Sequence, residues 1–281
     1  MPEQLRVLPH VASTEQSNEG PLTVRSGRVK HARRLATRAF RDKTGEFLAE
    51  GPQAVREALA AGAVIEVFAT SKYDDWRDDA VTWNVVDDDL LGEIADAVTP
   101  QGIVARCRSV VGTLDDLPAE AGFVVVCADV RDPGNAGAVI RCADAAGADA
   151  VILAGDSVDP LNPKAVRAGV GSLFHLPVVV DGDVAAVIAL LRERGLRVLA
   201  ADGHGELDLF DPAVDLVPPT AWLFGNEAWG LPEDVRDLAD AVVAVPIFGR
   251  AESLNLATAA AVCLYATAWA RRRDPEVDVR N

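Results

Sequence analysis

The chain has 281 residues, of which 49% are hydrophobic and 25% charged, a mixture that can build one large globular domain or two modest ones. No apolar run is long enough to span a bilayer, and the amino terminus lacks the basic-then-apolar order of a signal peptide, so we expect a cytoplasmic protein without membrane contact. The formal net charge of −16 argues against a nucleic-acid partner unless the basic residues are concentrated in one place.

The basic residues are indeed concentrated, in a stretch between residues 25 and 43 whose single acid is Asp42. A solvated helix face is the common reading of such a run. The density of this cluster also makes it a candidate RNA-contact surface. The residues expected to contact RNA are Arg28, Lys30, Arg33, Arg34, Arg38 and Arg41.

The first part of the chain predicts a small α/β domain over residues 25–111, preceded by a loose arm at 1–24. A mild apolar stripe predicts a helix over 28–41. Strands are expected at 47–49, 64–70, 81–86 and 102–108, and helices at 52–61 and 90–97. Residues 112–122 are rich in turn-forming residues and are expected to be the linker to a second domain.

The second domain, residues 123–281, alternates strands with helices, which predicts a mostly parallel sheet. Strands are expected at 123–127, 150–153, 176–180, 197–201, 221–224 and 241–245. Helices are expected at 136–146, 163–170, 184–194 and 254–271. The four cysteines form no Cys-x-x-Cys pair and the four histidines lack ligand spacing, which favours buried free thiols and argues against a zinc site.

Three segments of this domain combine glycine, amide and charged residues next to a strand end, where ligands of open α/β sheets bind. They span residues 129–141, 223–232 and 245–256. Each taken alone could be an ordinary turn before a helix, and Ser253 is a natural N-cap for the last helix. Asn255 is harder to explain, because an amide in an apolar first turn needs a polar partner. None of the segments is a Gly-x-Gly-x-x-Gly fingerprint, so a nicotinamide-dependent oxidoreductase is a distant alternative.

Taken in order, the three segments resemble the signature motifs of the SpoU/TrmH family of RNA ribose 2′-O-methyltransferases. The first contains Asn135, Gly137 and Arg141; the second reads Phe-Gly-Asn-Glu at 224–227; and the third reads Val-Pro-Ile at 245–247 and Ser-Leu-Asn at 253–255. The resemblance covers residues 123–270. Residues 47–51 and 55–58 are similar to the small ribosomal-protein-like RNA-binding domain that accompanies many of these enzymes.

The resemblance implies a deep trefoil knot in the carboxyl-terminal domain, a homodimer with an active site shared across the interface, and S-adenosylmethionine as the methyl donor, with no metal. It implies that the cofactor is lined by Leu223, Gly225, Val245, Ile247 and Leu254. The implied catalytic residues are Asn135, Arg141, Glu227, Ser253 and Asn255. We expect Arg141 to stabilise negative charge on the attacking 2′-oxygen, and whether it also accepts the proton is left open.

The expected substrate is structured RNA, with 23S ribosomal RNA favoured over transfer RNA because of the accessory domain. Among the members that this chain resembles are 23S rRNA methyltransferases that protect the ribosome against antibiotics, so both a resistance role and a housekeeping role are open. Two further alternatives are a non-catalytic RNA-binding module, against which the intact motif residues argue, and a base-directed methyltransferase, against which Arg141 and the Ser-Leu-Asn motif argue.

Overall fold

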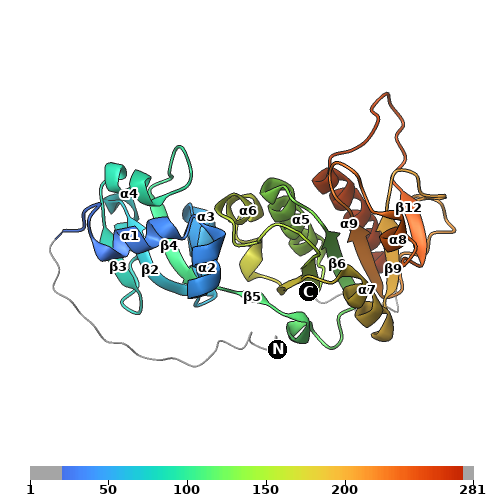
Figure 1. Cartoon of the computed structure of the whole chain (residues 1–281), viewed down its shortest axis with the longest axis horizontal. Helices are drawn as coiled ribbons and strands as arrows, with labels where there is room; N and C mark the ends of the chain where they lie inside the picture. Colours follow the sequence, from blue (N-terminus) through green and yellow to red (C-terminus); the bar gives the residue numbers. More distant parts are fainter. Residues whose placement is uncertain (1–20, 275–281) are drawn as a thin grey trace.

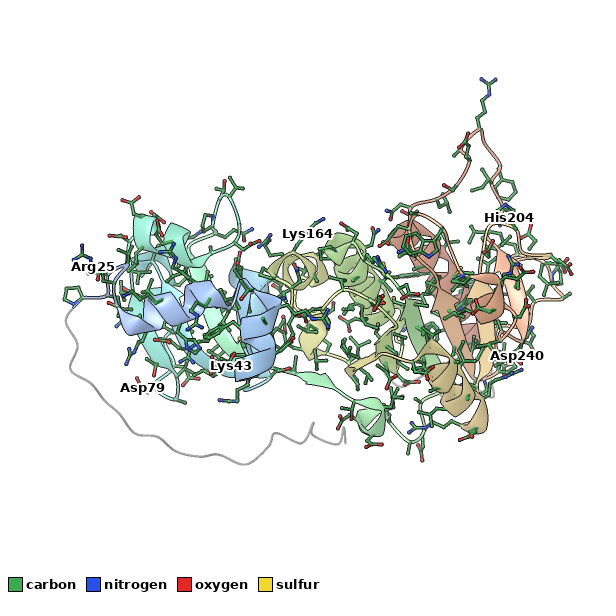
Figure 2. The ribbon with its side chains drawn as sticks, viewed as in Figure 1. Arg25, Lys43, Asp79, Lys164, His204 and Asp240 are labelled. Atoms are coloured by element: carbon green, nitrogen blue, oxygen red, sulfur yellow. The ribbon has the colours of Figure 1, made fainter. Side chains whose placement is uncertain are left out.

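The computed structural model describes residues 21–274, which form two α/β domains joined by a short connection (Figure 1). The arm expected at residues 1–24 lies almost wholly outside the described residues. Arg25 and Asp240 lie near opposite ends of the elongated molecule, with Lys164 between them (Figure 2). Within residues 21–274 no helix is long and apolar enough to cross a membrane, and no cluster of potential ligands could hold a metal ion.

The amino-terminal domain is a four-stranded mixed sheet with strand order β1-β4-β2-β3. Strands β1 and β2 run antiparallel to β4, and β3 runs parallel to β2. The α/β prediction for this domain is therefore confirmed. Its elements are α1 (Gly27–Arg34), α2 (Arg38–Thr44), β1 (Glu46–Glu50), α3 (Pro52–Ala60), β2 (Val64–Ala69), the 3-10 helix η1 (Ser71–Trp76), β3 (Thr82–Val85), α4 (Asp88–Ile94) and β4 (Ile103–Arg108).

The prediction of a single helix over residues 28–41 is wrong, because this stretch forms two separate helices, α1 and α2. The Arg41 side chain folds back and donates to the carbonyl oxygens of Leu35 (2.9 Å) and Ala36 (3.0 Å), which the end of α1 leaves without helical partners. Its Nε donates to Asp159 Oδ2 of the other domain at 2.8 Å. Arg41 is only 3% exposed, and its guanidinium binds groups within the protein. The prediction that it contacts RNA is therefore also wrong.

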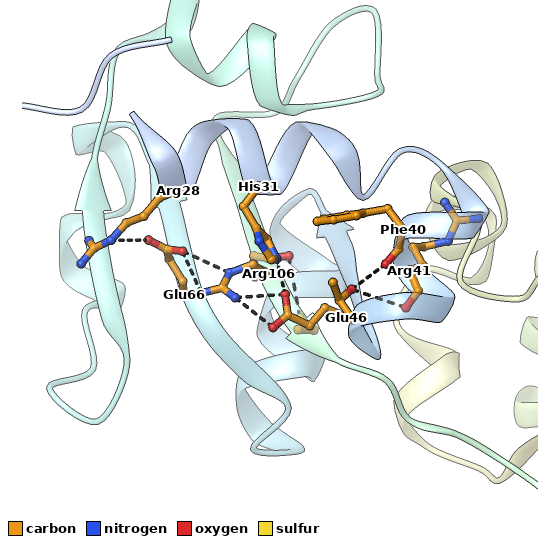
Figure 3. A network of polar contacts seen from close by, with 10 residues as sticks. Arg28, His31, Phe40, Arg41, Glu46, Glu66 and Arg106 are labelled. Atoms are coloured by element: carbon orange, nitrogen blue, oxygen red, sulfur yellow. Dashed lines mark hydrogen bonds and ion pairs between the residues drawn. The ribbon is translucent and has the colours of Figure 1, made fainter. Parts of the chain in front are cut away.

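A polar network fastens α1 to the sheet beneath it (Figure 3). Arg106 forms ion pairs with Glu46 (3.0 Å) and with Glu66 (3.1 Å), whose side chain is buried. From α1, His31 reaches Glu46 at 2.6 Å and Arg28 approaches Glu66 at 3.6 Å. Paired charges of this kind fix the orientation of the helix on the sheet, and Arg28 is directed at a protein carboxylate.

The carboxyl-terminal domain is an eight-stranded sheet, ordered β10-β12-β9-β11-β6-β7-β8-β5, in which every neighbouring pair is parallel. The predicted parallel sheet is confirmed, whereas the knot stays a prediction. Its strands are β5 (Val111–Gly112), β6 (Phe123–Ala128), β7 (Ala150–Ala154), β8 (Val178–Asp181), β9 (Arg197–Ala201), β10 (Leu207–Asp208), β11 (Thr220–Phe224) and β12 (Ala241–Ala244). Its helices are η2 (Leu114–Asp116), α5 (Pro133–Ala146), α6 (Pro163–Gly169), η3 (Ser172–Phe174), α7 (Val184–Glu193), α8 (Glu233–Arg236) and α9 (Leu256–Arg273).

Both faces of this sheet are covered, which explains why its strands read as continuous apolar runs. On one face α5 and α9 pack over alternate strand residues such as Val125 and Trp222. On the other face α7 and α8 pack over the intervening residues, such as Val124 and Leu223. The fully buried Trp222 donates its indole N–H to Thr267 Oγ1 of α9 at 2.8 Å, so α9 is fixed by a hydrogen bond as well as by packing.

All four cysteines are free, and three of them are buried; the prediction of buried free thiols is confirmed for these three and is wrong for the fourth, Cys142. Desolvation by burial raises the pKa of Cys107, Cys127 and Cys263 to about 12. These thiols stay protonated and therefore act as small apolar side chains. Cys142 is half-buried, and burial raises its pKa as well.

The two domains share one apolar core and do not merely touch. Phe47 of β1 stacks on Phe174 of η3 with a centroid distance of 6.0 Å, and the two lie in one continuous buried cluster. Next to this stack, Arg167 of α6 donates to the buried carboxylate of Glu50 at 3.0 Å. Apolar burial and an ion pair at one interface hold the domains in a fixed relative orientation.

His175 adds a pH-sensitive contact between the domains. Its Nε2 lies 3.1 Å from Glu57 of α3, and its Nδ1 lies 2.8 Å from Asp144 of α5. Burial alone would lower the pKa of His175, but hydrogen bonds to Asp144 and Glu57 outweigh it, so the pKa is raised above its ordinary value. A carboxylate at each ring nitrogen favours the doubly protonated imidazole, which can donate from both nitrogens.

A raised folded-state pKa means that the stabilisation by His175 is fully present below the ordinary histidine pKa, about 6.5, and is lost as the pH rises through the folded value. We therefore expect the Tm difference between wild type and His175→Gln to be largest near pH 6 and to shrink toward about pH 9. Thermal unfolding across this pH range measures it. A constant difference would show that the imidazole charge contributes nothing.

Candidate functional site

The three segments singled out in the sequence meet at the carboxyl edge of the parallel sheet. Strands β6 and β11 are hydrogen-bonded neighbours, with Cys127 opposite Phe224, so the loops that follow them emerge side by side. Strand β12 lies two positions from β11, with β9 between them. The loop between β12 and α9 projects from the end of the domain (Figure 1).

Glu227 connects the first two segments. Its Oε1 accepts hydrogen bonds from the Asn135 side chain (3.1 Å) and from the backbone N–H of Asp132 (3.1 Å). Its Oε2 accepts a weaker bond from the backbone N–H of Arg131 at 3.3 Å. The carboxylate thereby sits over the amino-terminal end of α5, where free N–H groups and the helix dipole favour a negative charge.

Asn255 joins the third segment to this cluster. Its Nδ2 donates to Asn135 Oδ1 at 3.0 Å, so a continuous hydrogen-bond chain runs from Glu227 through Asn135 to Asn255. The structure thus brings together three of the five predicted catalytic residues. All three are solvent-accessible polar groups, as a site that handles a polar substrate requires.

Ser253 is not the N-cap of the last helix, contrary to the sequence-based prediction. The cap is Asn255, whose Oδ1 accepts hydrogen bonds from the N–H groups of Ala257 (2.9 Å) and Thr258 (3.4 Å). The cap role explains why an amide stands at this position: its oxygen closes the helix and its nitrogen is free to bind Asn135. Ser253 is exposed, and within residues 21–274 it has no hydrogen bond to the cluster.

The loop after β11 is closed by its own backbone. Asn226 and Gly230 exchange two N–H···O bonds of 2.9 Å each, and the buried Asn226 side chain donates to the carbonyl of Asp129 at 2.7 Å. A Cβ on Gly225 would lie 2.4 Å from the carbonyl carbon of Gly230. Glycine at 225 is therefore demanded by the chain itself, and its predicted cofactor contact rests on the resemblance.

The start of α5 is held by Asp132, which caps Asn135 N–H at 2.9 Å and pairs with Lys164 of α6 at 2.7 Å. The hydrogen bond from the Lys164 ammonium keeps the pKa of Asp132 below its ordinary value. Close packing of α5 on α6 continues at Gly137, where a Cβ would approach the carbonyl oxygen of Ala165 to 2.2 Å. These contacts fix the helix that carries Asn135.

Arg141 stands apart from the hydrogen-bonded cluster. It lies six residues after Asn135 on α5, about 9 Å along the axis and roughly 240° around it, so the two side chains leave different faces of the helix. Arg141 is exposed and, within residues 21–274, has no ion pair or hydrogen bond. Its guanidinium is free to bind an anion that another molecule presents.

The residues predicted to line a cofactor lie at the ends of β11 and β12 and in the loop that follows. Leu223 is buried in β11, Val245 and Leu254 are half-buried, and Ile247 is 38% exposed. Among the described residues, the backbone N–H and C=O groups of 245–254 make no hydrogen bonds within the chain. Unpaired backbone groups beside apolar side chains can bind a nucleoside, so the donor and acceptor set fits S-adenosylmethionine.

Sequence reasoning missed the supporting residues Asp129, Asp132, Lys164 and Asn226. Asp129 adopts a left-handed conformation (φ 57°) and its Oδ1 accepts the N–H of Asp156 at 2.7 Å. Two signals were present: an acid at the end of a buried strand, and an aspartate directly before a Pro-Gly helix start. The partner Lys164 carries no local signal, because it lies on another helix.

The comparisons with known proteins agree with this geometry. Residues 122–265 match the SpoU rRNA methylase family, and residues 27–105 match the MRM3-like substrate binding domain. The chain is 35% identical to a 23S rRNA (uridine(2479)-2′-O)-methyltransferase of Streptomyces viridochromogenes, over 82% of this chain and 85% of that protein. It is 32% identical to the 23S rRNA (guanosine(2553)-2′-O)-methyltransferase RlmP of Bacillus subtilis, over 86% of this chain and 96% of that protein.

A solved structure extends the similarity to three dimensions. The SpoU methyltransferase AviRb from Streptomyces viridochromogenes, in complex with the cofactor AdoMet, superposes with a TM-score of 0.79 at 32% identity. The superposition covers 89% of this chain and all of that one, so it includes both domains.

The double role of Asn255 gives a stability prediction. Asn255→Ala removes the helix cap and is expected to lower the free energy of unfolding by about 1 kcal/mol more than Asn255→Ser, which keeps a capping oxygen and likewise loses the donor to Asn135. Urea unfolding of both variants measures the difference. Equal losses in the two variants would mean that the cap does not stabilise α9.

Proposed function

This chain belongs to the SpoU rRNA methylase family, and we propose that it transfers a methyl group from S-adenosylmethionine to a ribose 2′-hydroxyl of 23S ribosomal RNA. The observation that carries the proposal is the Glu227–Asn135–Asn255 chain beside the unpaired backbone of 245–254. One feature suits a polar substrate and the other a nucleoside cofactor. Both relatives named above are 23S rRNA 2′-O-methyltransferases, and the similarity extends over 85% and 96% of their lengths.

When bound, S-adenosylmethionine supplies a methyl group on a positively charged sulfur. The methyl group would pass to the ribose 2′-oxygen, the sulfur would leave as a neutral thioether, and the hydroxyl proton would pass to solvent. Arg141 stabilises the negative charge that develops on the 2′-oxygen and binds the adjacent phosphate. A guanidinium keeps its protons in proteins, so electrostatic stabilisation is the role we assign to it.

Asn135, held by Glu227 and Asn255, orients the ribose through its amide. The three side chains fix one another's rotamers, so the amide dipole points in a set direction before substrate arrives. Ser253 lies two residues before Asn255 on the same loop, and we assign it to substrate contact. Leu223, Val245, Ile247 and Leu254 would pack against the cofactor, and Gly225 would allow its close approach.

The amino-terminal domain supplies the RNA-backbone surface in this proposal. Three exposed cations lie on α1 (Lys30, Arg33 and Arg34), and the exposed Arg38 begins α2, in contrast to the buried Arg41. Two of them are held by surface acids, Arg33 by Glu93 at 2.9 Å and Arg38 by Asp42 at 3.7 Å. Exposed pairs of this kind are weak and can exchange their partner for a phosphate.

We further propose that the enzyme is a homodimer whose site is completed by Arg141 of the partner subunit. Arg141 points away from its own cluster, and α9 beside it exposes Tyr265 (55%) and Trp269 (66%). These aromatics line a groove of about 690 Å³ between α9 and the end of α5. Large exposed aromatic groups that line a groove suit a self-complementary interface.

The first experiment measures transfer of tritiated methyl groups to ribosomal and transfer RNA. Wild type should label a 23S nucleotide as 2′-O-methylribose, and Arg141→Ala should lower kcat by about a hundredfold to a thousandfold with unchanged cofactor affinity. Arg236→Ala, on the opposite face of the sheet, is the control. Label in transfer RNA alone would correct the substrate, and cofactor binding without any label in free RNA or in ribosomal subunits would overturn the enzyme proposal.

Co-expression of Arg141→Ala chains with Asn255→Ala chains tests the shared site. If the arginine acts across the interface, the mixed dimer has one intact site, and random pairing restores about a quarter of wild-type activity. If Arg141 and Asn255 act within one chain, each site of the mixed dimer lacks one of the two side chains. Activity then stays at the level of the single variants.

A further inference from the structure

We propose that Trp229 and Arg131 form a stacking platform that binds one unpaired base of the RNA substrate beside the methyl-transfer site. The proposal rests on the proposed function and specifies how that site holds its substrate. Neither residue belongs to the hydrogen-bond chain described above.

Trp229 is exposed to an extent that packing does not require. More than half of its surface (55%) is open to solvent, although a tryptophan is usually largely buried. The Arg131 guanidinium lies 5.3 Å from the centre of the indole ring. The two residues come from different loops, one after β6 and one after β11; both side chains are more than half exposed, and the guanidinium lies over the indole ring.

The backbone that carries Trp229 is held in place by hydrogen bonds. Trp229 lies in the loop that the two Asn226–Gly230 backbone bonds close, and the N–H of Ala228 donates to Asn226 Oδ1 at 2.8 Å. Gly230 completes the turn with a φ of +70°. A ring on a fixed backbone loses little conformational freedom when a ligand stacks on it, which favours binding.

The platform also lies directly beside the proposed ribose-binding amide. Glu227, two residues before Trp229, accepts from the backbone N–H of Arg131 (3.3 Å) and from the side chain of Asn135 (3.1 Å). One carboxylate thus positions the base-stacking loop and the residue assigned to the ribose. A nucleotide next to the amide would have its base, or the base of its neighbour, within reach of the indole.

The chemistry of this surface selects an unpaired nucleobase. Proteins that read single-stranded RNA stack splayed bases on aromatic rings and on arginine planes. The Arg131–Asp156 ion pair is long (3.4 Å) and joins side chains that are 56% and 85% exposed, so the guanidinium can turn to a phosphate. Because every base offers a flat face, the platform supplies affinity and orientation and does not determine base identity.

The test compares wild type with Trp229→Leu and Trp229→Phe. The control is Phe210→Leu, which removes an equally exposed aromatic (58%) from the loop after β10. Affinity is measured by anisotropy with a fluorescein-labelled single-stranded oligouridylate, and stacking by quenching of a 2-aminopurine placed in the same oligonucleotide. Steady-state methyl transfer to transcribed 23S rRNA separates KM from kcat.

We expect Trp229→Leu to weaken oligonucleotide binding and to raise the KM for RNA about tenfold to a hundredfold, with loss of the 2-aminopurine quenching. The kcat, the KM for S-adenosylmethionine and the oligomeric mass should not change. Trp229→Phe should retain most of the affinity, and Phe210→Leu should match wild type.

Wild-type binding and quenching in Trp229→Leu would overturn the platform, as would a defect confined to cofactor affinity or to oligomeric mass. If wild type and Trp229→Leu methylate RNA equally well, the platform is wrong and the proposed function stands. If wild type methylates no RNA while oligonucleotide binding still depends on Trp229, the proposed function is wrong and the platform stands as an RNA contact.

Discussion

The Glu227 carboxylate is the contact on which the rest of the site depends. It accepts hydrogen bonds from two backbone N–H groups of the loop between β6 and α5 and from the Asn135 amide in the first turn of α5, while its own backbone belongs to the loop after β11. Without it, the hydrogen bond from the Asn226 side chain to the Asp129 carbonyl would still join the two loops, but nothing would tie the loop after β11 to the start of α5. Asn135 would also lose the partner that orients its amide toward Asn255.

Much of the fold could be predicted from the pattern of apolar residues and from the prolines and glycines at helix ends. The buried strands of the carboxyl-terminal domain read as apolar runs, and its helices begin at Pro133 and Pro163 and end at glycines, so their existence and order were predictable. Short edge strands such as β5 and β10 were not, because two residues carry no periodic signal. The break between α1 and α2 was hidden, because the Arg41 contacts that accompany it include Asp159 of the other domain, which no local pattern indicates.

The candidate site divides in the same way. Asn135, Glu227 and Asn255 were predictable as a set from the ordered motifs, but not the chain of hydrogen bonds that joins them. Which atoms meet depends on the pairing of β6 with β11, a contact between residues almost one hundred positions apart. The basic surface could be predicted only in part. The high density of basic residues in the sequence identified the cluster, but Arg41 is buried, and local composition does not indicate which cations become buried in the fold.

The shared core between the domains has a consequence for how an RNA would be selected. With Phe47 stacked on Phe174 and Arg167 bound to Glu50, the basic helix and the strand-end site are held at one separation and one angle. The distance between the basic helix and the strand-end site is therefore fixed. If the basic residues bind RNA as proposed, the RNA must place a phosphate path and a reactive ribose at that spacing, and its tertiary structure far from the modified nucleotide would then decide which ribose is in reach.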